Sequence, residues 1–187
     1  MAFRRPSSRT YDEAALYDYA IGALGRKMRT VAEIKRLMRQ RVAKQEDGND
    51  LIERVVVRLK DQKYLNDSQY AAAYSSYRKD NEKFGRMRVV TELKAKGVHG
   101  DVIEKSVAAA YDGTNEEKLE RDFLRRKRLK KPADQKQAAR IFRALARAGF
   151  GTRTAVTILR HWEVDDELLT TLESETAETP TEPDPSA

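Results

Sequence analysis

Residues 86–98 read RMRVVTELKAKGV, and this stretch decides the fold. Its apolar side chains recur at helical spacing among charged ones, and Gly97 followed by a valine then ends the helix in a Gly-apolar turn. Residues 101–111 carry apolar side chains at every fourth position, which indicates a further helix after that turn. The segment therefore predicts two helices joined by a glycine turn.

This pattern returns twice along the chain. Residues 145–150, LARAGF, form the last copy, and Leu93 and Leu145 are 52 residues apart, as are the glycines that follow them. In the first copy, Leu37 aligns with Leu93 at a separation of 56 residues. An aromatic-rich helix precedes each pair, and each unit alone is too small for a deep core, so neighbouring units must share apolar faces. The sequence therefore predicts an all-α fold of three tandem three-helix repeats forming an elongated, curved helical body.

Helix starts and composition set the expected boundaries. Five starts are indicated by a capping residue with an acid or amide three positions later: Thr10 with Glu13, Thr30 with Glu33, Asn66 with Gln69, Asp101 with Glu104, and Thr114 with Glu117. The last fifteen residues hold three prolines and no bulky apolar side chain, so they cannot offset the entropy lost on ordering. We expect a flexible N-terminus at 1–10, repeats at 11–65, 66–112 and 113–172, and a disordered acidic tail at 173–187.

The distribution of charge favours a polyanionic partner. The chain carries a formal charge of +7, but every Lys and Arg lies at or before Arg160, so residues 1–162 hold 37 basic and 21 acidic side chains and a net charge of +16. A body this basic attracts polyanions, and salt weakens the attraction. Solvated helix surfaces also carry many charges, but the size of the excess favours nucleic acid or an acidic protein groove.

The residue inventory argues against an enzyme. The chain has no cysteine and two histidines, His99 and His161, neither with an acid at a spacing that builds a zinc site or a catalytic triad. The glycines form no phosphate-binding loop. We therefore expect no catalysis, no metal and no cofactor. No apolar run is long enough to span a membrane and residues 1–10 lack a signal-peptide core, so we expect a cytoplasmic protein without a membrane partner.

The middle of the chain resembles a known family. Residues 63–67 read KYLND, residues 70–74 read YAAAY, and residues 92–98 read ELKAKGV after Gly85. This order is similar to the middle repeat of the RecX family, the bacterial regulators of the RecA recombinase, in which a YL-D turn leads into an aromatic helix and an EL--KG turn closes the next one.

The flanking segments fit the same family. Residues 30–37 resemble the second helix of its first repeat, and residues 122–127 resemble the first helix of its third repeat, so the resemblance covers about residues 11–162. Three features depart from the family pattern: Arg86 follows the glycine where the family often has proline, the first repeat has a longer connection at 44–49, and the acidic tail is additional.

The resemblance implies a non-enzymatic regulator that lies in the groove of a RecA–DNA filament and inhibits its recombinase, ATPase and co-protease activities. Its partners would be the RecA filament and single-stranded or duplex DNA, bound weakly and in a salt-sensitive way, and a monomer is expected. The run at 125–131 is the densest basic cluster, equally compatible with a solvated helix end. We expect contacts with filament or DNA from Arg26, Lys27, Arg29, Arg36, Arg39, Arg78, Lys83, Arg86, Arg88, Lys94, Lys96, Arg125, Arg126, Lys127 and Arg128.

A direct DNA reader is the alternative hypothesis. Helix, glycine turn and helix occur at Gly97 and again at Gly149, as in helix-turn-helix proteins. After Gly97 the recognition helix would start with residues 101–104, DVIE, which are acidic and apolar where base contacts need Arg, Asn or Gln. A set better suited to DNA follows Gly149: Thr152, Arg153, Thr154, Thr157 and Arg160. A generic RNA-associated helical repeat stays open as a third interpretation.

Overall fold

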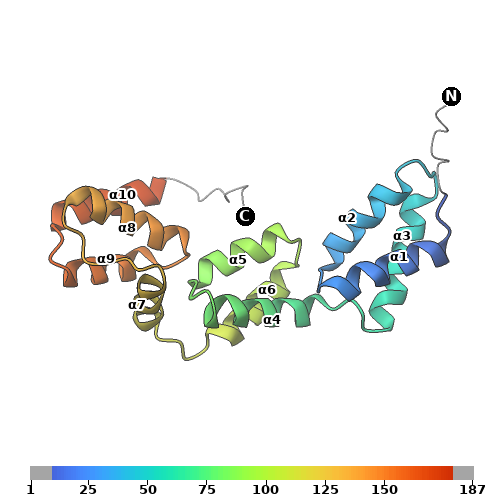
Figure 1. Ribbon diagram of the computed structural model, residues 1–187, viewed down its shortest axis with the longest axis horizontal. Helices are drawn as coiled ribbons and strands as arrows, with labels where there is room; N and C mark the ends of the chain where they lie inside the picture. Colours follow the sequence, from blue (N-terminus) through green and yellow to red (C-terminus); the bar gives the residue numbers. More distant parts are fainter. Residues whose placement is uncertain (1–9, 179–187) are drawn as a thin grey trace, which may run out of the picture. The chain divides into compact units, whose positions relative to one another are not determined.

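The computed structural model describes residues 10–178, which form ten α-helices and no β-strand (Figure 1). The all-α prediction is confirmed. The helices are α1 (Glu13–Arg26), α2 (Val31–Val42), α3 (Gly48–Asp61), α4 (Asp67–Asp80), α5 (Arg86–Ala95), α6 (Gly100–Tyr111), α7 (Glu116–Arg126), α8 (Gln135–Arg147), α9 (Thr152–His161) and α10 (Asp166–Glu178). Within the described residues, unit 1 covers 10–70 and 96–98, and unit 2 covers 71–95 and 99–178.

Unit 1 is built on α1, α2 and α3, each of which packs on the other two. Its core is lined on α2 by Ile34, Met38 and Val42, which recur every four residues, whereas Leu37 is only half-buried. The alignment of Leu37 with Leu93 is therefore wrong by one residue, because fully buried Met38 takes the place in α2 that Leu93 has in α5. An unbranched methionine fills such a position as readily as a leucine.

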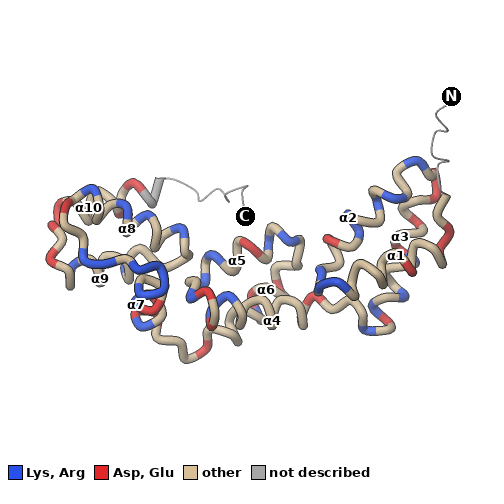
Figure 2. Tube along the Cα trace, viewed as in Figure 1, with Lys and Arg blue, Asp and Glu red and all other residues tan. Residues whose placement is uncertain are grey.

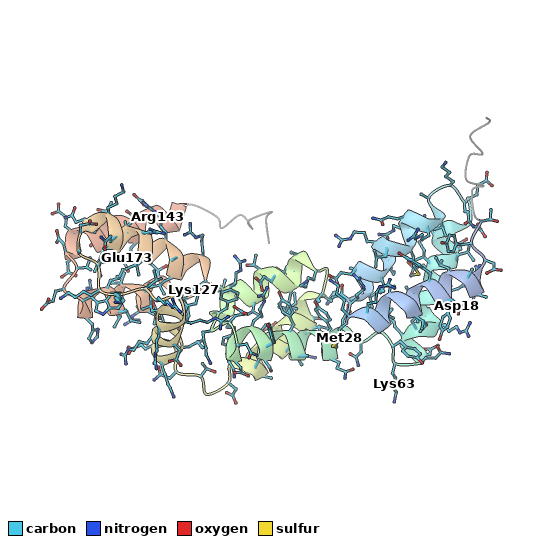
Figure 3. The ribbon with its side chains drawn as sticks, in the orientation of Figure 1. Asp18, Met28, Lys63, Lys127, Arg143 and Glu173 are labelled. Atoms are coloured by element: carbon cyan, nitrogen blue, oxygen red, sulfur yellow. The ribbon has the colours of Figure 1, made fainter. Side chains whose placement is uncertain are left out.

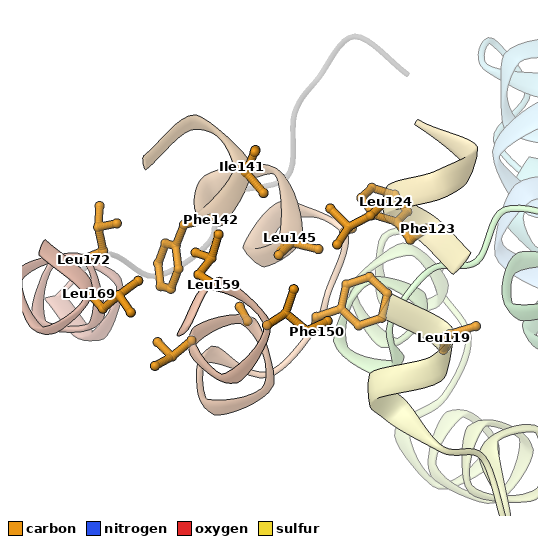
Figure 4. Close-up of a cluster of buried hydrophobic side chains, with 14 residues drawn as sticks. Leu119, Phe123, Leu124, Ile141, Phe142, Leu145, Phe150, Leu159, Leu169 and Leu172 are labelled. Atoms are coloured by element: carbon orange, nitrogen blue, oxygen red, sulfur yellow. The ribbon is translucent and has the colours of Figure 1, made fainter. Parts of the chain in front are cut away.

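Unit 2 has its largest core among its last four helices. Phe142 on α8, Leu159 on α9 and Leu169 on α10 meet in this cluster, together with two leucines and one phenylalanine of α7 (Figure 4). Because α10 buries Leu169 and Leu172 and runs to Glu178, the prediction of disorder from residue 173 is wrong for residues 173–178. The rest of the predicted tail, 179–187, and all but the last residue of the predicted N-terminal segment lie outside the described residues.

The helices fall into the expected order of triplets, with one addition. Three helices lie within 11–65 and three within 66–112, while four helices follow residue 113. The division of the chain into three repeats at these boundaries stays a prediction, since the two compact units cut the chain elsewhere.

Two of the five predicted helix starts are confirmed. Thr30 forms a full capping box with Glu33 at the start of α2, and Asn66 accepts the backbone N–H of Gln69 at the start of α4. The other three are wrong by one or two residues: α1 is capped by Asp12 instead of Thr10, α7 is capped by Asn115 instead of Thr114, and α6 begins at Gly100 instead of after Asp101. Where two polar residues are adjacent, the sequence alone does not select the cap.

The two glycine turns have the same structural reason. Gly97 has φ +73°, and a Cβ there would lie 2.4 Å from the Cβ of Ala32 within unit 1. Gly149 has φ +85°, and a Cβ there would lie 2.1 Å from the backbone nitrogen of Arg88 within unit 2. Both positions need a left-handed backbone and a close approach of another helix, and only glycine supplies both without strain.

Candidate nucleic-acid interface

One face of α8 carries a row of cations. Lys136, Arg140, Arg143 and Arg147 are all exposed and stand four, three and four residues apart, so helical geometry places them on one side of the helix. Figure 2 colours the Lys and Arg positions along α8 blue. The helix contains no acidic residue. Arg143 forms an exposed ion pair with Glu175, whereas the side chains of the other three have no ion pair or hydrogen bond within residues 10–178.

The end of α8 meets the start of α5. The backbone N–H of Gly85 donates to the carbonyl of Ala148 at 2.8 Å, and the N–H of Met87 donates to that of Gly149 at 3.2 Å. Backbone donors at the start of α5, which have no partner within their own helix, thus bond carbonyl acceptors at the end of α8, and the two helix dipoles are in series. The last turn of α8, with Arg147, therefore adjoins the first turn of α5 (Figure 1).

The exposed face of α5 extends this set of cations. Arg86 in its first turn and Lys94 in its last turn are exposed and have no ion pair in the described part of the chain. Met87 between them is 61% exposed. We define the basic row as six residues of unit 2 on these two abutting helices: Lys136, Arg140, Arg143, Arg147, Arg86 and Lys94.

Two predicted contact residues of the same region are held inside the protein. The Nε of Arg78 lies 2.9 Å and the Nε of Arg88 lies 2.8 Å from the carboxylate of Glu92, which is 14% exposed. The hydroxyl of Tyr74 donates to the same carboxylate at 2.8 Å. Burial, followed by this hydrogen bond, raises the pKa of Tyr74 above its ordinary value. These cations hold α4 and α5 together, and their contact with a ligand stays a prediction.

The densest basic run of the sequence is mostly occupied. Arg125 pairs with Asp122 at 2.8 Å, and Arg126 pairs with Glu82 at 3.0 Å. Lys131 pairs with Glu163 and Lys127 lies over the ring of Phe123, whereas Arg128 and Lys130 are exposed and have no ion pair among residues 10–178. Outside this run, the predicted contact residue Lys83 lies in the turn after α4 with a left-handed φ of 59°. The side chain of Arg125 nevertheless remains 80% exposed.

The predicted residues of unit 1 divide in the same way. Arg26, Lys27, Arg36 and Arg39 are exposed and make no ion pair among the residues that the structure describes. Two others are engaged: Arg29 donates from Nε to the carbonyl of Ala23, and Lys96 lies 3.5 Å from the carboxylate of Glu33. Among the predicted contact residues, unit 1 therefore presents four free cations, at the end of α1 and on α2.

Three free cations of the basic row escaped the sequence analysis. Lys136, Arg140 and Arg147 lie in a segment that was treated as repeat scaffold because no two of them are adjacent in the chain. The signal that identifies them is periodicity: over residues 135–147 the cations recur at helical spacing and no acid interrupts them. A search for adjacent Lys and Arg finds the run at 125–128 instead, which is the one largely occupied.

The start of α9 is acidic rather than basic. A shallow pocket of about 380 Å³ there is lined by Arg153 and Thr154 but also by Glu116 and Glu117 of α7. The Glu116 carboxylate accepts the backbone N–H of Gly151 at 3.2 Å, so it takes a donor that a DNA phosphate would need. This arrangement disfavours α9 as a recognition helix for duplex DNA.

One carboxylate of unit 2 is buried without a partner. The side chain of Glu120 on α7 is fully buried, and neither of its oxygens has a hydrogen-bond partner in residues 10–178. Burial, with the negative charges of Glu116 and Glu117 adding to it, raises the pKa of Glu120 to about 8. The group is therefore mostly protonated at neutral pH.

No group of three or more His, Asp or Glu side chains among residues 10–178 could hold a metal ion. None of their helices has the length and apolar character needed to cross a membrane.

Comparisons with known proteins point to one family. A family model described as RecX, second three-helix domain, matches residues 66–107. The chain is 32% identical over 150 residues to the regulatory protein RecX of Deinococcus radiodurans, covering 79% of this chain and 68% of that protein. It is 31% identical over 140 residues to the regulatory protein RecX of Bacillus velezensis, covering 74% of this chain and 52%, about half, of that relative.

A solved structure has the same fold. The crystal structure of RecX from Lactobacillus salivarius matches with a TM-score of 0.59 and 20% sequence identity, covering 81% of this chain and 96% of that one. At this identity the likeness concerns the fold alone.

Proposed function

Because the chain belongs to the RecX family of regulatory proteins, we propose that it binds the RecA–DNA filament in the cytoplasm and inhibits the filament's recombinase, ATPase and co-protease activities. It would thereby modulate recombination and DNA repair as a monomer, by binding and without catalysis. The observation that carries the proposal is the basic row on α8 and α5, most of whose cations have no ion pair within residues 10–178.

The geometry of the row suits a phosphate backbone. Cations three or four residues apart on a helix are about 5–6 Å from their neighbours, and α8 and α5 are roughly 20 and 15 Å long. Four of the six residues are arginines, whose planar donor fork bonds phosphate oxygens in pairs. A strand of DNA bound in a filament can therefore contact several members of the row at once.

The electrostatics predict how this binding depends on salt. Each phosphate neutralised on a single strand contributes about 0.7 to the slope of log K against log salt, so six contacts give a slope of roughly −4. Such binding is sequence-independent, as a regulator of a filament on arbitrary DNA requires.

An ATPase titration tests the proposal. Substoichiometric protein is expected to suppress the DNA-dependent ATPase of RecA, and no effect at a several-fold molar excess over RecA would contradict the proposed function. The double variant K94E/K136E reverses two exposed lysines of the row and is expected to raise the half-inhibitory concentration at least about tenfold.

The matched control reverses two lysines outside the row. Lys105 on α6 and Lys118 on α7 are also exposed and unpaired within the described residues, so K105E/K118E changes the net charge by the same amount. If both double variants lose inhibition equally, net charge and not the row is responsible, and the row is the wrong surface.

A further inference from the structure

A pocket of about 330 Å³ opens beside the basic row. It lies in unit 2, where the start of α5, the end of α6 and the start of α7 meet, and Figure 3 shows these helices with their side chains. Arg86 belongs to the basic row and also lines this pocket. The volume is at the lower end of the roughly 300–1,000 Å³ that small-molecule sites occupy, so the pocket suits a single planar group.

The walls of the pocket offer apolar and aromatic surface. Leu119 of α7 and the half-buried ring of Tyr111 line it, together with Met87 of α5, which is 61% exposed. The hydroxyl of Tyr111 donates to the carbonyl of Phe84 at 2.8 Å, which holds the ring in place. An aromatic ring and a polarisable thioether both pack favourably on the face of an unpaired base.

The polar groups of the pocket suit the edge of a base better than a phosphate. Glu116 of α7 accepts the backbone N–H of Gly151 with Oε1 at 3.2 Å, while its Oε2 has no hydrogen-bond partner among the described residues. A carboxylate repels a phosphate but accepts from an exocyclic amino group, such as N4 of cytosine. An aliphatic side chain of a protein would cover this oxygen without bonding it. The lining therefore favours a base as the occupant.

We propose that this pocket receives one unstacked base of a single strand whose phosphates lie on the basic row, and that Glu116 selects bases with an exocyclic amino group over thymine. This inference rests on the proposed function, since it names how the same surface holds nucleic acid. Arg86 holds the phosphate beside the pocket, and the base packs against Tyr111 and Leu119. Thymine presents the acceptor O4 where cytosine presents an amino group, so it meets the carboxylate unfavourably.

Single strands with and without bases test the pocket. Fluorescence anisotropy compares deoxycytidine, thymidine and abasic strands of the same length, about twelve nucleotides. We expect the deoxycytidine strand to bind about tenfold more tightly than the abasic strand, because stacking adds to the same phosphate contacts. It should bind about fivefold more tightly than the thymidine strand. Equal affinities for all three strands would overturn the pocket as a base site and leave the row in place.

A variant with a matched control isolates the carboxylate. Glu116→Ala removes the acceptor, whereas Glu117→Ala removes the same charge from the next residue of α7, which does not line this pocket. The preference for cytosine over thymine should vanish in the first variant and persist in the second. A preference that survives Glu116→Ala, or that both variants lose equally, would mean that Glu116 does not read the base.

Nuclear magnetic resonance locates the base. The methyl signal of Met87 and the amide signals of Thr114 and Gly151 should shift when the deoxycytidine strand is added and stay unchanged with the abasic strand. Signals that respond equally to both strands, or to RecA and to no strand, would overturn the proposal; the second result would assign the pocket to a protein side chain. The strand measurements contain no RecA, so a failed ATPase titration would remove the proposed function and leave the base pocket separately decided.

Discussion

Two sets of cations in unit 2 differ in what surrounds them. Arg78 and Arg88 converge on one carboxylate, that of Glu92, and are three-quarters buried. Arg140 and Arg147 project from α8 with no partner among residues 10–178. The first set therefore holds α4 and α5 together, and the second set contributes little to folding.

The difference shows how to separate structural charges from binding charges. Removing a partly buried cation that shares a carboxylate lowers the stability of the fold, because the carboxylate is left without its full counter-charge. An exposed cation without a partner costs almost nothing to remove and is free to meet a phosphate. Stability and binding should therefore respond to different residues of the same unit.

The largest effect on stability is expected at the junction between the end of α8 and the start of α5, which positions both sets of cations. Gly149→Ala forces a side chain into a left-handed backbone and against the nitrogen of Arg88, so we expect the free energy of unfolding to fall by about 4 kcal/mol. Urea denaturation measures this. Gly22→Ala is the control, because a Cβ at that position in α1 meets nothing within 4 Å, and it should stabilise by about 0.5–1 kcal/mol. A small loss at Gly149 would mean that the junction does not hold α5 in place.

Glu120 is the opposite case, because it is a buried carboxylate without a cationic partner among the described residues. Its pKa of about 8 in the folded protein exceeds that of an unfolded glutamate, about 4.3, so the folded state binds more protons and stability falls as pH rises between these values. Glu120→Gln removes this dependence. The difference in the free energy of unfolding between the variant and the parent protein should therefore shift in favour of the variant by about 3 kcal/mol from pH 5 to pH 8.

Thermal unfolding at several pH values checks that prediction. Glu104→Gln on the exposed face of α6 should leave the profile of the parent protein unchanged. Parallel profiles for the parent and Glu120→Gln would contradict the burial of an unpartnered carboxylate.

The next largest effect is expected at Glu92, the carboxylate that Arg78 and Arg88 share. Glu92→Gln leaves Arg78 and Arg88 without their counter-ion, and we expect a loss of about 2 kcal/mol in the free energy of unfolding. Chemical denaturation measures the loss, and a salt titration should narrow the gap between variant and parent only slightly because the network is partly buried. An unchanged midpoint would mean that these cations are no more engaged than those of α8.

The smallest stability effect is expected in the second set. The double variant R140A/R147A should change the free energy of unfolding by less than about 0.5 kcal/mol, because neither side chain has a partner to lose. Its slope of log K against log salt for single-stranded DNA should become shallower by about 1.4. Fluorescence anisotropy measures the slope, and an unaltered slope would show that these arginines do not meet phosphates.

Much of the fold could be predicted because glycines and periodic apolar residues report local geometry. The turn at Gly97 and the capping box of Thr30 were predicted from residues close in sequence, and both are confirmed. The full length of α10 was missed because two buried leucines, Leu169 and Leu172, anchor a helix that then continues through polar residues. Composition alone gives no sign of such an anchor.

The candidate site was less predictable, because availability depends on partners distant in sequence. Nothing near Arg126 in the chain reveals its pairing with Glu82, 44 residues away. Conversely, the row of unpaired cations on α8 is recognised only when residues 135–147 are assumed to be helical and the positions of their charges around the helix axis are compared. Which of the predicted cations contact filament or DNA stays a prediction.

The hydrogen bonds between Gly85, Met87 and the end of α8 have a consequence for folding. The first backbone N–H groups of α5 donate to the carbonyls of residues 148 and 149, which are synthesised long after α5. The start of α5 therefore lacks these hydrogen bonds until α8 has docked. The amide protons of Gly85 and Met87 should therefore exchange with solvent at the rate at which α8 detaches. These two protons are natural reporters of the most distant step in the assembly of unit 2.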